Sequence, residues 1–143
     1  MSRLQKLRIV AEWDVALNNL LICSKWNRSP GSNCGRCGNC VRSMLEFVVL
    51  GKLDASPFRG HEISAALVRS AVVTNEYAES AWGQLIAPLA AAGRNELARA
   101  VQAVLGEYRR RKRIAAAKER ARELDRRYLG GLAVRLNRFA RHA

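Results

Sequence analysis

The sequence predicts a mainly α-helical protein, an irregular helical domain with four cysteines near its N-terminus and a long basic helix at its C-terminus. Ala, Leu, Val and Arg dominate its 143 residues, and only three prolines interrupt them. Apolar residues recur at helical spacing along most of the chain. Because 49% of the residues are hydrophobic, the chain can bury a core of its own.

The first 33 residues are expected to form two short helices and a loop. Ser2 and Gln5 have the spacing of a capping box, in which each side chain bonds the backbone of the other residue. Asp14 is a candidate N-cap for the second helix, and Trp13 is expected on an apolar face, in the core. Residues 24–33 are rich in turn formers and predict a loop.

The middle of the chain predicts three further helices. Asn75 is a plausible N-cap, Pro88 is expected to kink or end the helix that contains it, and Gly93 closes the region. The three helices are expected from Cys40 to a stop at Gly51, from His61 to about Val73, and from Asn75 to about Pro88.

The last third predicts one or two long helices. A first apolar seam runs through Leu97, Val101, Val104 and Tyr108, and a second begins at Ile114. The second seam starts six residues after Tyr108, which is about 120° away on an ideal helix. Either the helix breaks between the seams, or its two halves pack on different surfaces.

Positive charge is concentrated in this last third. The formal charge is +13, and residues 94–143 carry fifteen Lys and Arg against five Asp and Glu. The densest run is Arg109, Arg110, Arg111, Lys112 and Arg113, which is a candidate contact for an anion or a nucleic acid. The alternative is a solvated helix face carrying local ion pairs, such as Glu119 with Arg122.

The four cysteines have the spacing of a metal site. Cys23 is followed after ten residues by Cys34, Cys37 and Cys40, with two residues between each pair. Four thiolates complete the tetrahedral shell of a structural zinc ion. Gly35 allows a tight turn between two of the ligands, and the helix predicted from Cys40 places its positive end beside a thiolate. We therefore predict one structural Zn²⁺ at Cys23, Cys34, Cys37 and Cys40.

Three alternatives to zinc remain open. An iron–sulfur cluster also uses four cysteines, but the fourth ligand lies upstream here instead of following the run. The second alternative, disulfides, needs an oxidising compartment, and the third is that the thiols are free. A thiolate nucleophile is not expected, because no histidine lies close in sequence. His61 and His142 are interpreted as surface residues, and Trp26 as packing over the metal site.

The residues around the cysteines resemble a known motif. Cys23, together with the run Asn33-Cys34-Gly35-Arg36-Cys37-Gly38-Asn39-Cys40-Val41-Arg42-Ser43-Met44-Leu45, is similar to the C-terminal cysteine motif of 7-cyano-7-deazaguanine synthases and synthase-like proteins. These are PP-loop ATP pyrophosphatases with a Rossmann-like nucleotide domain. The resemblance covers about residues 4–60, and it implies a structural zinc ion on the same four cysteines.

The catalytic signature of that family is not found in this sequence. Its activity depends on a Ser-Gly-Gly-x-Asp-Ser phosphate loop, and Ser-Gly-Gly occurs nowhere in the chain. The resemblance therefore implies a zinc-binding structural or docking module, which is not catalytic alone and has a PP-loop nucleotide-binding protein or domain as partner. As part of a larger or split protein it would serve an ATP-dependent synthase. The rival function is a nucleic-acid-binding zinc protein that uses the basic C-terminal helix.

Two segments follow from these patterns, residues 1–60 with the cysteine motif and residues 61–143 with the basic helical region, and they are expected to form one continuous domain. The N-terminus has no apolar segment typical of a secretory signal, and no apolar run is long enough to cross a bilayer. A cytoplasmic location is therefore expected, where thiols stay reduced and four clustered cysteines favour metal over disulfides.

Overall fold

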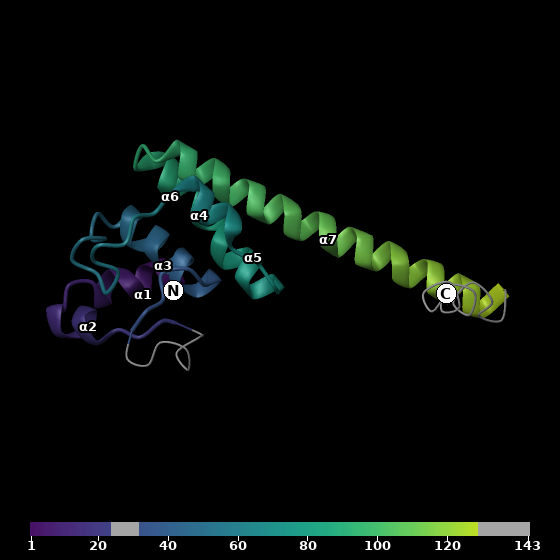
Figure 1. Ribbon diagram of the computed structural model, residues 1–143, viewed down its shortest axis with the longest axis horizontal. Coiled ribbons are helices and arrows are strands. Elements are labelled where there is room, and N and C mark those ends of the chain that lie inside the picture. Colours follow the sequence, from purple (N-terminus) through teal and green to yellow (C-terminus); the bar gives the residue numbers. More distant parts are fainter. Residues whose placement is uncertain (24–31, 129–143) are drawn as a thin grey trace, which may run out of the picture. The chain divides into compact units, whose positions relative to one another are not determined.

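The computed structural model describes residues 1–23 and 32–128, and it confirms a mainly helical fold. No strand occurs in this described part. Its helices are α1 (Arg3–Val10), α2 (Asp14–Asn19), α3 (Gly38–Val49), α4 (Ala65–Ser70), α5 (Glu76–Gly83), α6 (Ile86–Ala91) and α7 (Asn95–Tyr128), all labelled in Figure 1.

The chain divides into two compact units, Met1–Tyr108 and Arg109–Ala143. The first unit contains α1 to α6 and the first part of α7, and the second contains the rest of α7. The sequence boundary proposed near residue 60 stays a prediction. No helix in the described ranges combines the length and apolar character needed to cross a membrane.

The first helix forms as its capping residues predict, whereas the second differs in two respects. Ser2 Oγ accepts from the Gln5 amide at 3.2 Å, and Gln5 Oε1 accepts from the Ser2 amide at 2.6 Å. Helix α2 begins at Asp14, so Trp13 and not Asp14 is the N-cap. Trp13 is also 67% exposed. As the N-cap, with an extended backbone, Trp13 lies outside the helix that buries Leu17, and the prediction of a core position was wrong.

Helices α3 and α4 begin at other residues than the sequence predicted. Helix α3 begins two residues before Cys40, at Gly38, and Gly51 follows its end with a φ of +65°, as expected of a C-terminal stop. Helix α4 spans six residues and is shorter than the predicted 61–73 helix. Ser64 Oγ accepts from the Leu67 amide at 3.1 Å and caps the helix there, so residues 61–63 lie outside it.

The segment after residue 74 forms two helices where one was predicted. Asn75 Oδ1 accepts from the Ala78 amide at 2.8 Å, which confirms Asn75 as the N-cap of α5. The break falls after Gly83, before the proline and not at it. Pro88 lies in the first turn of α6, where its missing N–H would have no helical partner. Gly93 then closes the region with a φ of +74°.

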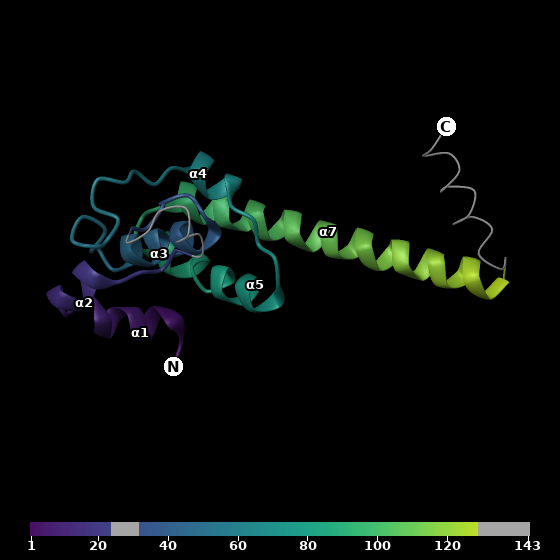
Figure 2. The same ribbon diagram turned by 60° about the horizontal axis from the view of Figure 1, so that its bottom comes forward.

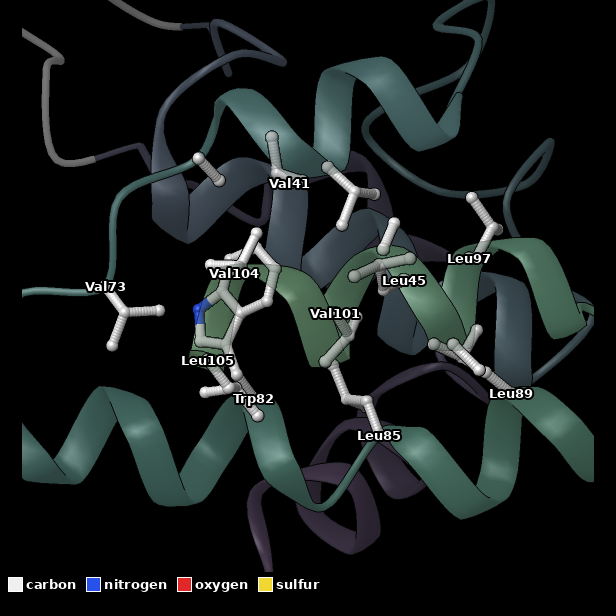
Figure 3. Packing of buried hydrophobic residues seen from close by; sticks show 14 residues of the cluster. Val41, Leu45, Val73, Trp82, Leu85, Leu89, Leu97, Val101, Val104 and Leu105 are labelled. Atoms are coloured by element: carbon white, nitrogen blue, oxygen red, sulfur yellow. The ribbon is translucent and has the colours of Figure 1, made fainter. Parts of the chain in front are cut away.

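One face of α3 packs into an aliphatic core. Val41 and Leu45 of α3 meet side chains from α4, α5, α6 and the first part of α7, and Figure 3 shows how they converge around Trp82. We call this set the aliphatic core. Its buried members are Val41, Leu45, Val68, Ala71, Val73, Trp82, Leu85, Leu89, Leu97, Ala98, Ala100, Val101, Val104 and Leu105.

The other face of α3 packs into a second core, which contains three of the cysteines. In Figure 2, α1 and α4 lie on opposite sides of α3, and the α1 side belongs to this second set. We call it the cysteine core. Its buried members are Leu7, Ala11, Leu17, Cys23, Cys37, Cys40, Met44, Phe47 and Phe58. Helix α3 therefore supplies both cores and fixes the cysteine segment against them.

Over its described residues 109–128 the second unit is a helix that is exposed except at Asp125. No break occurs in α7 at the Arg109–Arg113 run, so the helix continues through both apolar seams. The second seam is not buried: Ile114 is 41% exposed and Leu124 is 56% exposed. The predicted pair of Glu119 with Arg122 is present at 3.4 Å.

Candidate metal centre

The four cysteines come from two segments of the first unit. Cys34 and Cys37 lie in the turn before α3, and Cys40 lies in the first turn of that helix. Cys23 follows α2 after a short extended stretch. Three ligands are therefore local, and only Cys23 is brought in from a distant position along the chain.

The sulfur atoms have the spacing of ligands to one ion. All four Sγ atoms lie within 4.8 Å of one another. The Cys23 and Cys37 sulfurs are 3.9 Å apart, and those of Cys34 and Cys40 are 3.8 Å apart. A tetrahedron with metal–sulfur distances of about 2.3 Å has sulfur–sulfur edges of about 3.8 Å. The four-cysteine cluster thus has the size and donor set of a closed tetrahedral metal site.

Backbone geometry holds the local ligands in place. Gly35 has a φ of +66°, a conformation that side-chain-bearing residues rarely adopt, and this turn brings the Cys37 amide to 3.4 Å from Cys34 Sγ. Cys37 is the N-cap of α3, and its carbonyl accepts from the Val41 amide at 2.9 Å. Amides that point at sulfur and the positive helix end both stabilise thiolate.

The environment acts in opposite directions on two of the thiols. Burial raises the pKa of Cys34, but amide hydrogen bonds from Arg36 and Cys37 and the contact with Cys23 leave that pKa below its ordinary value. Burial raises the pKa of Cys40, which is fully buried, and its hydrogen bond with Cys37 raises it further. A bound divalent cation would reverse this effect, since metal binding deprotonates coordinating thiols.

Asn33 joins the distant ligand to the local ones. Its Oδ1 accepts from the Ile22 amide at 2.8 Å and from the Cys23 amide at 3.1 Å. Its Nδ2 donates to the Leu20 carbonyl at 2.9 Å. Asn33 belongs to the predicted 24–33 loop, and its short amide side chain directly before Cys34 is a signal for such backbone bonding.

His61 covers the turn between Cys34 and Cys37. A Cβ atom on Gly35 would lie 2.5 Å from His61 Nδ1, so the imidazole rests directly on this glycine. The His61 ring meets Phe58 edge-on at 6.2 Å between centroids, and Phe58 is fully buried in the cysteine core. His61 is exposed, as predicted, yet it borders the site. No sequence pattern indicated this contact.

The remaining predicted residues belong to the second unit, to the aliphatic core, or to segments outside the described ranges. Arg109, Arg110, Arg111, Lys112 and Arg113 are exposed residues on α7, in the second unit. Trp26 and His142 lie outside the described residues. Trp82 is buried in the aliphatic core. Among the predicted site residues, the structure brings the four cysteines together in one cluster.

Comparisons of this chain with protein-family models, with curated proteins and with solved structures found no match.

Proposed function

We propose that this protein is a zinc-stabilised structural module that docks to a partner carrying a nucleotide site. The main support for this proposal is the four-cysteine cluster, in which every Sγ lies within 4.8 Å of the others. A closed shell of four thiolates has no open position for substrate or water, which is typical of structural and not of catalytic zinc.

The sulfur spacing favours one ion over an iron–sulfur cluster. In a four-iron cluster each cysteine binds a different iron atom, so the cysteine sulfurs stand farther apart than ligands that share one ion. The pairs at 3.8 and 3.9 Å match the shared-ion case. Among single ions, an all-thiolate tetrahedral shell favours zinc.

The structural role follows from what the ligands connect. Cys23 joins the segment after α2, and the other three ligands join the start of α3. A metal would therefore tie the N-terminal helices to the helix that carries both cores. Because such a site is not preformed in the unfolded chain, the binding free energy of the ion also stabilises the fold.

Metal analysis of the full chain tests this assignment. We expect one zinc per chain after purification without added metal. Cys37→Ser should lower the zinc content well below one, because a serine hydroxyl is a poor replacement for thiolate. The matched control, Ala100→Ser, adds a hydroxyl to the aliphatic core and should keep one zinc. Iron with inorganic sulfide, or no stoichiometric metal, would refute the zinc assignment.

Two features support the docking role. The cysteine motif resembles that of synthase-like PP-loop proteins, in which the nucleotide site lies in another part of the molecule. In addition, large apolar side chains on the N-terminal helices are exposed to solvent: Ile9 by 55%, Trp13 by 67% and Val15 by 77%. Exposed apolar side chains of this size are common in surfaces that bind a partner.

Sedimentation of this chain with a PP-loop ATP pyrophosphatase domain tests docking. We expect a complex with the full-length chain and a weaker complex with Trp13→Ser. Tyr77→Ser is the matched control, because Tyr77 is an exposed aromatic residue on α5 and should not be needed. The chain alone should release no AMP from ATP. Equal binding by the two variants would show that the surface around Trp13 does not bind the partner. AMP release by the chain alone would refute the non-catalytic role.

A second candidate function is nucleic-acid binding by the second unit. Residues 109–128 carry ten Lys and Arg against three Asp and Glu, and they form one exposed helix. Such a helix attracts phosphate without reading base sequence. A salt titration against random duplex and single strands is the test. Affinity that falls steeply with salt supports this candidate, and absence of binding at low salt excludes it.

A further inference from the structure

A cavity of about 360 Å³ lies between α1 and the first half of α3, and it is not part of the metal centre. Its polar lining consists of Arg3, Lys6, Asn39 and Arg42, and apolar side chains such as Leu7 and Val10 complete its wall. The volume is within the range of about 300–1,000 Å³ that is typical of small-molecule sites. Three cationic side chains line the cavity, and its described lining contains no acidic residue.

Arg42 is the unusual member of this lining. Only 6% of the residue is exposed, and its Nε is buried without a hydrogen-bond partner among the described residues. A buried donor without a partner is costly, and this same guanidinium group belongs to a residue that lines the cavity.

The one buried carboxylate nearby is already engaged by another cation. Arg3 Nε lies 3.0 and 3.1 Å from the two carboxylate oxygens of Glu46, and Arg3 Nη2 donates to Ser43 Oγ at 3.0 Å. Glu46 is only 1% exposed. One carboxylate therefore faces the charges of Arg3 and Arg42, and Lys6 adds a third cation to the same cavity. The local charge remains positive.

We propose that this cavity binds a small organic oxyanion, a phosphomonoester or carboxylate attached to an apolar body. The guanidinium and ammonium groups attract the oxyanion, and the planar guanidinium suits its oxygen atoms. The apolar wall holds the rest of the ligand. None of the lining residues is a cysteine, so the proposed site uses no ligand of the metal centre.

Calorimetric titration of the full chain tests the proposal, with phenyl phosphate, benzoate and inorganic phosphate as probes. We expect saturable one-to-one binding of phenyl phosphate, benzoate or both. We expect inorganic phosphate to bind roughly tenfold more weakly, because it cannot bury an apolar group. The comparison of phenyl phosphate with benzoate identifies which oxyanion the cavity prefers.

Two variants locate the binding. Arg42→Gln should weaken binding by about 10- to 100-fold through loss of a charged donor. Lys6 is exposed, so Lys6→Ala tests the same cavity without disturbing a buried group, and it should also weaken binding. Lys118→Ala makes the same charge change on the exposed part of α7 and should have no effect.

Three outcomes would overturn the proposal. The first is no saturable binding of either aromatic anion. The second is equal weakening by Lys6→Ala and Lys118→Ala, which would show that only the net charge attracts the probe. The third is tighter binding of an acidic peptide than of either small anion, which would make the cavity part of a protein-binding surface.

Discussion

The two faces of α3 pack into cores that differ in size and in chemistry. The aliphatic core consists of hydrocarbon side chains and Trp82, collected from α3 to α7. The cysteine core contains three thiols among its nine buried residues, and its other members come from the N-terminal helices, α3 and the loop after it. One helix thus joins a core made of hydrocarbon to a core built around metal ligands.

This difference has a consequence for stability. Burial of hydrocarbon stabilises a fold without any added component, at about 25 cal/mol for each Å² removed from water. Four thiols brought within 4.8 Å gain little from one another as neutral groups and repel one another as thiolates. We therefore expect the aliphatic core to be stable alone and the cysteine core to depend on its ion.

The largest expected effect is that of metal removal. Structural zinc contributes apparent binding free energies of about 10–16 kcal/mol in zinc-finger peptides, so loss of the ion should open the cysteine core. After chelation, hydrogen exchange should accelerate strongly at the amides of Ile22, Cys23 and Cys37. The amides of α7 near Val101 should keep their protection.

Readdition of zinc provides the control for this experiment. Protection at Cys23 and Cys37 should return with one equivalent of zinc and not with magnesium, which prefers oxygen ligands. Unfolding of both cores together after chelation would contradict the division between them. Unchanged exchange at every amide would show that the cysteine core needs no ion.

The second-largest effect is expected from shortening a side chain in the aliphatic core. Leu89 of α6 is fully buried in this core, so Leu89→Ala should lower the free energy of unfolding by about 2–5 kcal/mol. Urea denaturation measures this loss. Zinc content should remain at one per chain, because the deletion leaves all four ligands in place. A variant that folds but releases its zinc would contradict the independence of the two cores.

A smaller effect, on zinc affinity, is expected from Asn33, whose side chain positions Cys23. Asn33→Ala removes three hydrogen bonds to residues 20–23 and should weaken zinc binding by about 10- to 100-fold, as is common for groups that orient metal ligands. Competition with a chromophoric chelator measures the affinity. Asn19→Ala, which removes one local bond within α2, should leave it unchanged. Equal affinities in both variants would show that Asn33 does not position Cys23.

Features determined by a few neighbouring residues were predictable from the sequence. The capping box at Ser2, the N-cap at Asn75 and the stop at Gly51 each depend on local backbone bonding, and all three are present. The four-cysteine cluster was predictable for the same reason, since three of its ligands lie within seven residues.

Features determined by distant parts of the chain were not predictable. Trp13 has an apolar side chain, but whether it is buried depends on which neighbours surround it. The contact of His61 with Gly35 joins positions 26 residues apart, and no periodicity encodes such a pair. The predicted 61–73 helix was too long because the Ser64 cap competes with helical continuation at its N-terminal side.

The smallest expected effect isolates that contact between His61 and Gly35. Gly35 and Gly60 both have positive φ, at +66° and +79°, but only Gly35 lies under a side chain. Gly60→Ala should cost about 1–2 kcal/mol for the backbone conformation alone. Gly35→Ala should cost this amount plus the displacement of His61, since the new Cβ would lie 2.5 Å from Nδ1.

In the double variant Gly35→Ala, His61→Ala, the cost of displacing the ring should disappear and the cost of the backbone conformation should remain. Denaturation of the unmodified protein, Gly35→Ala, His61→Ala and the double variant measures this coupling. Additive losses would show that the ring moves aside freely and does not help to hold the turn between Cys34 and Cys37.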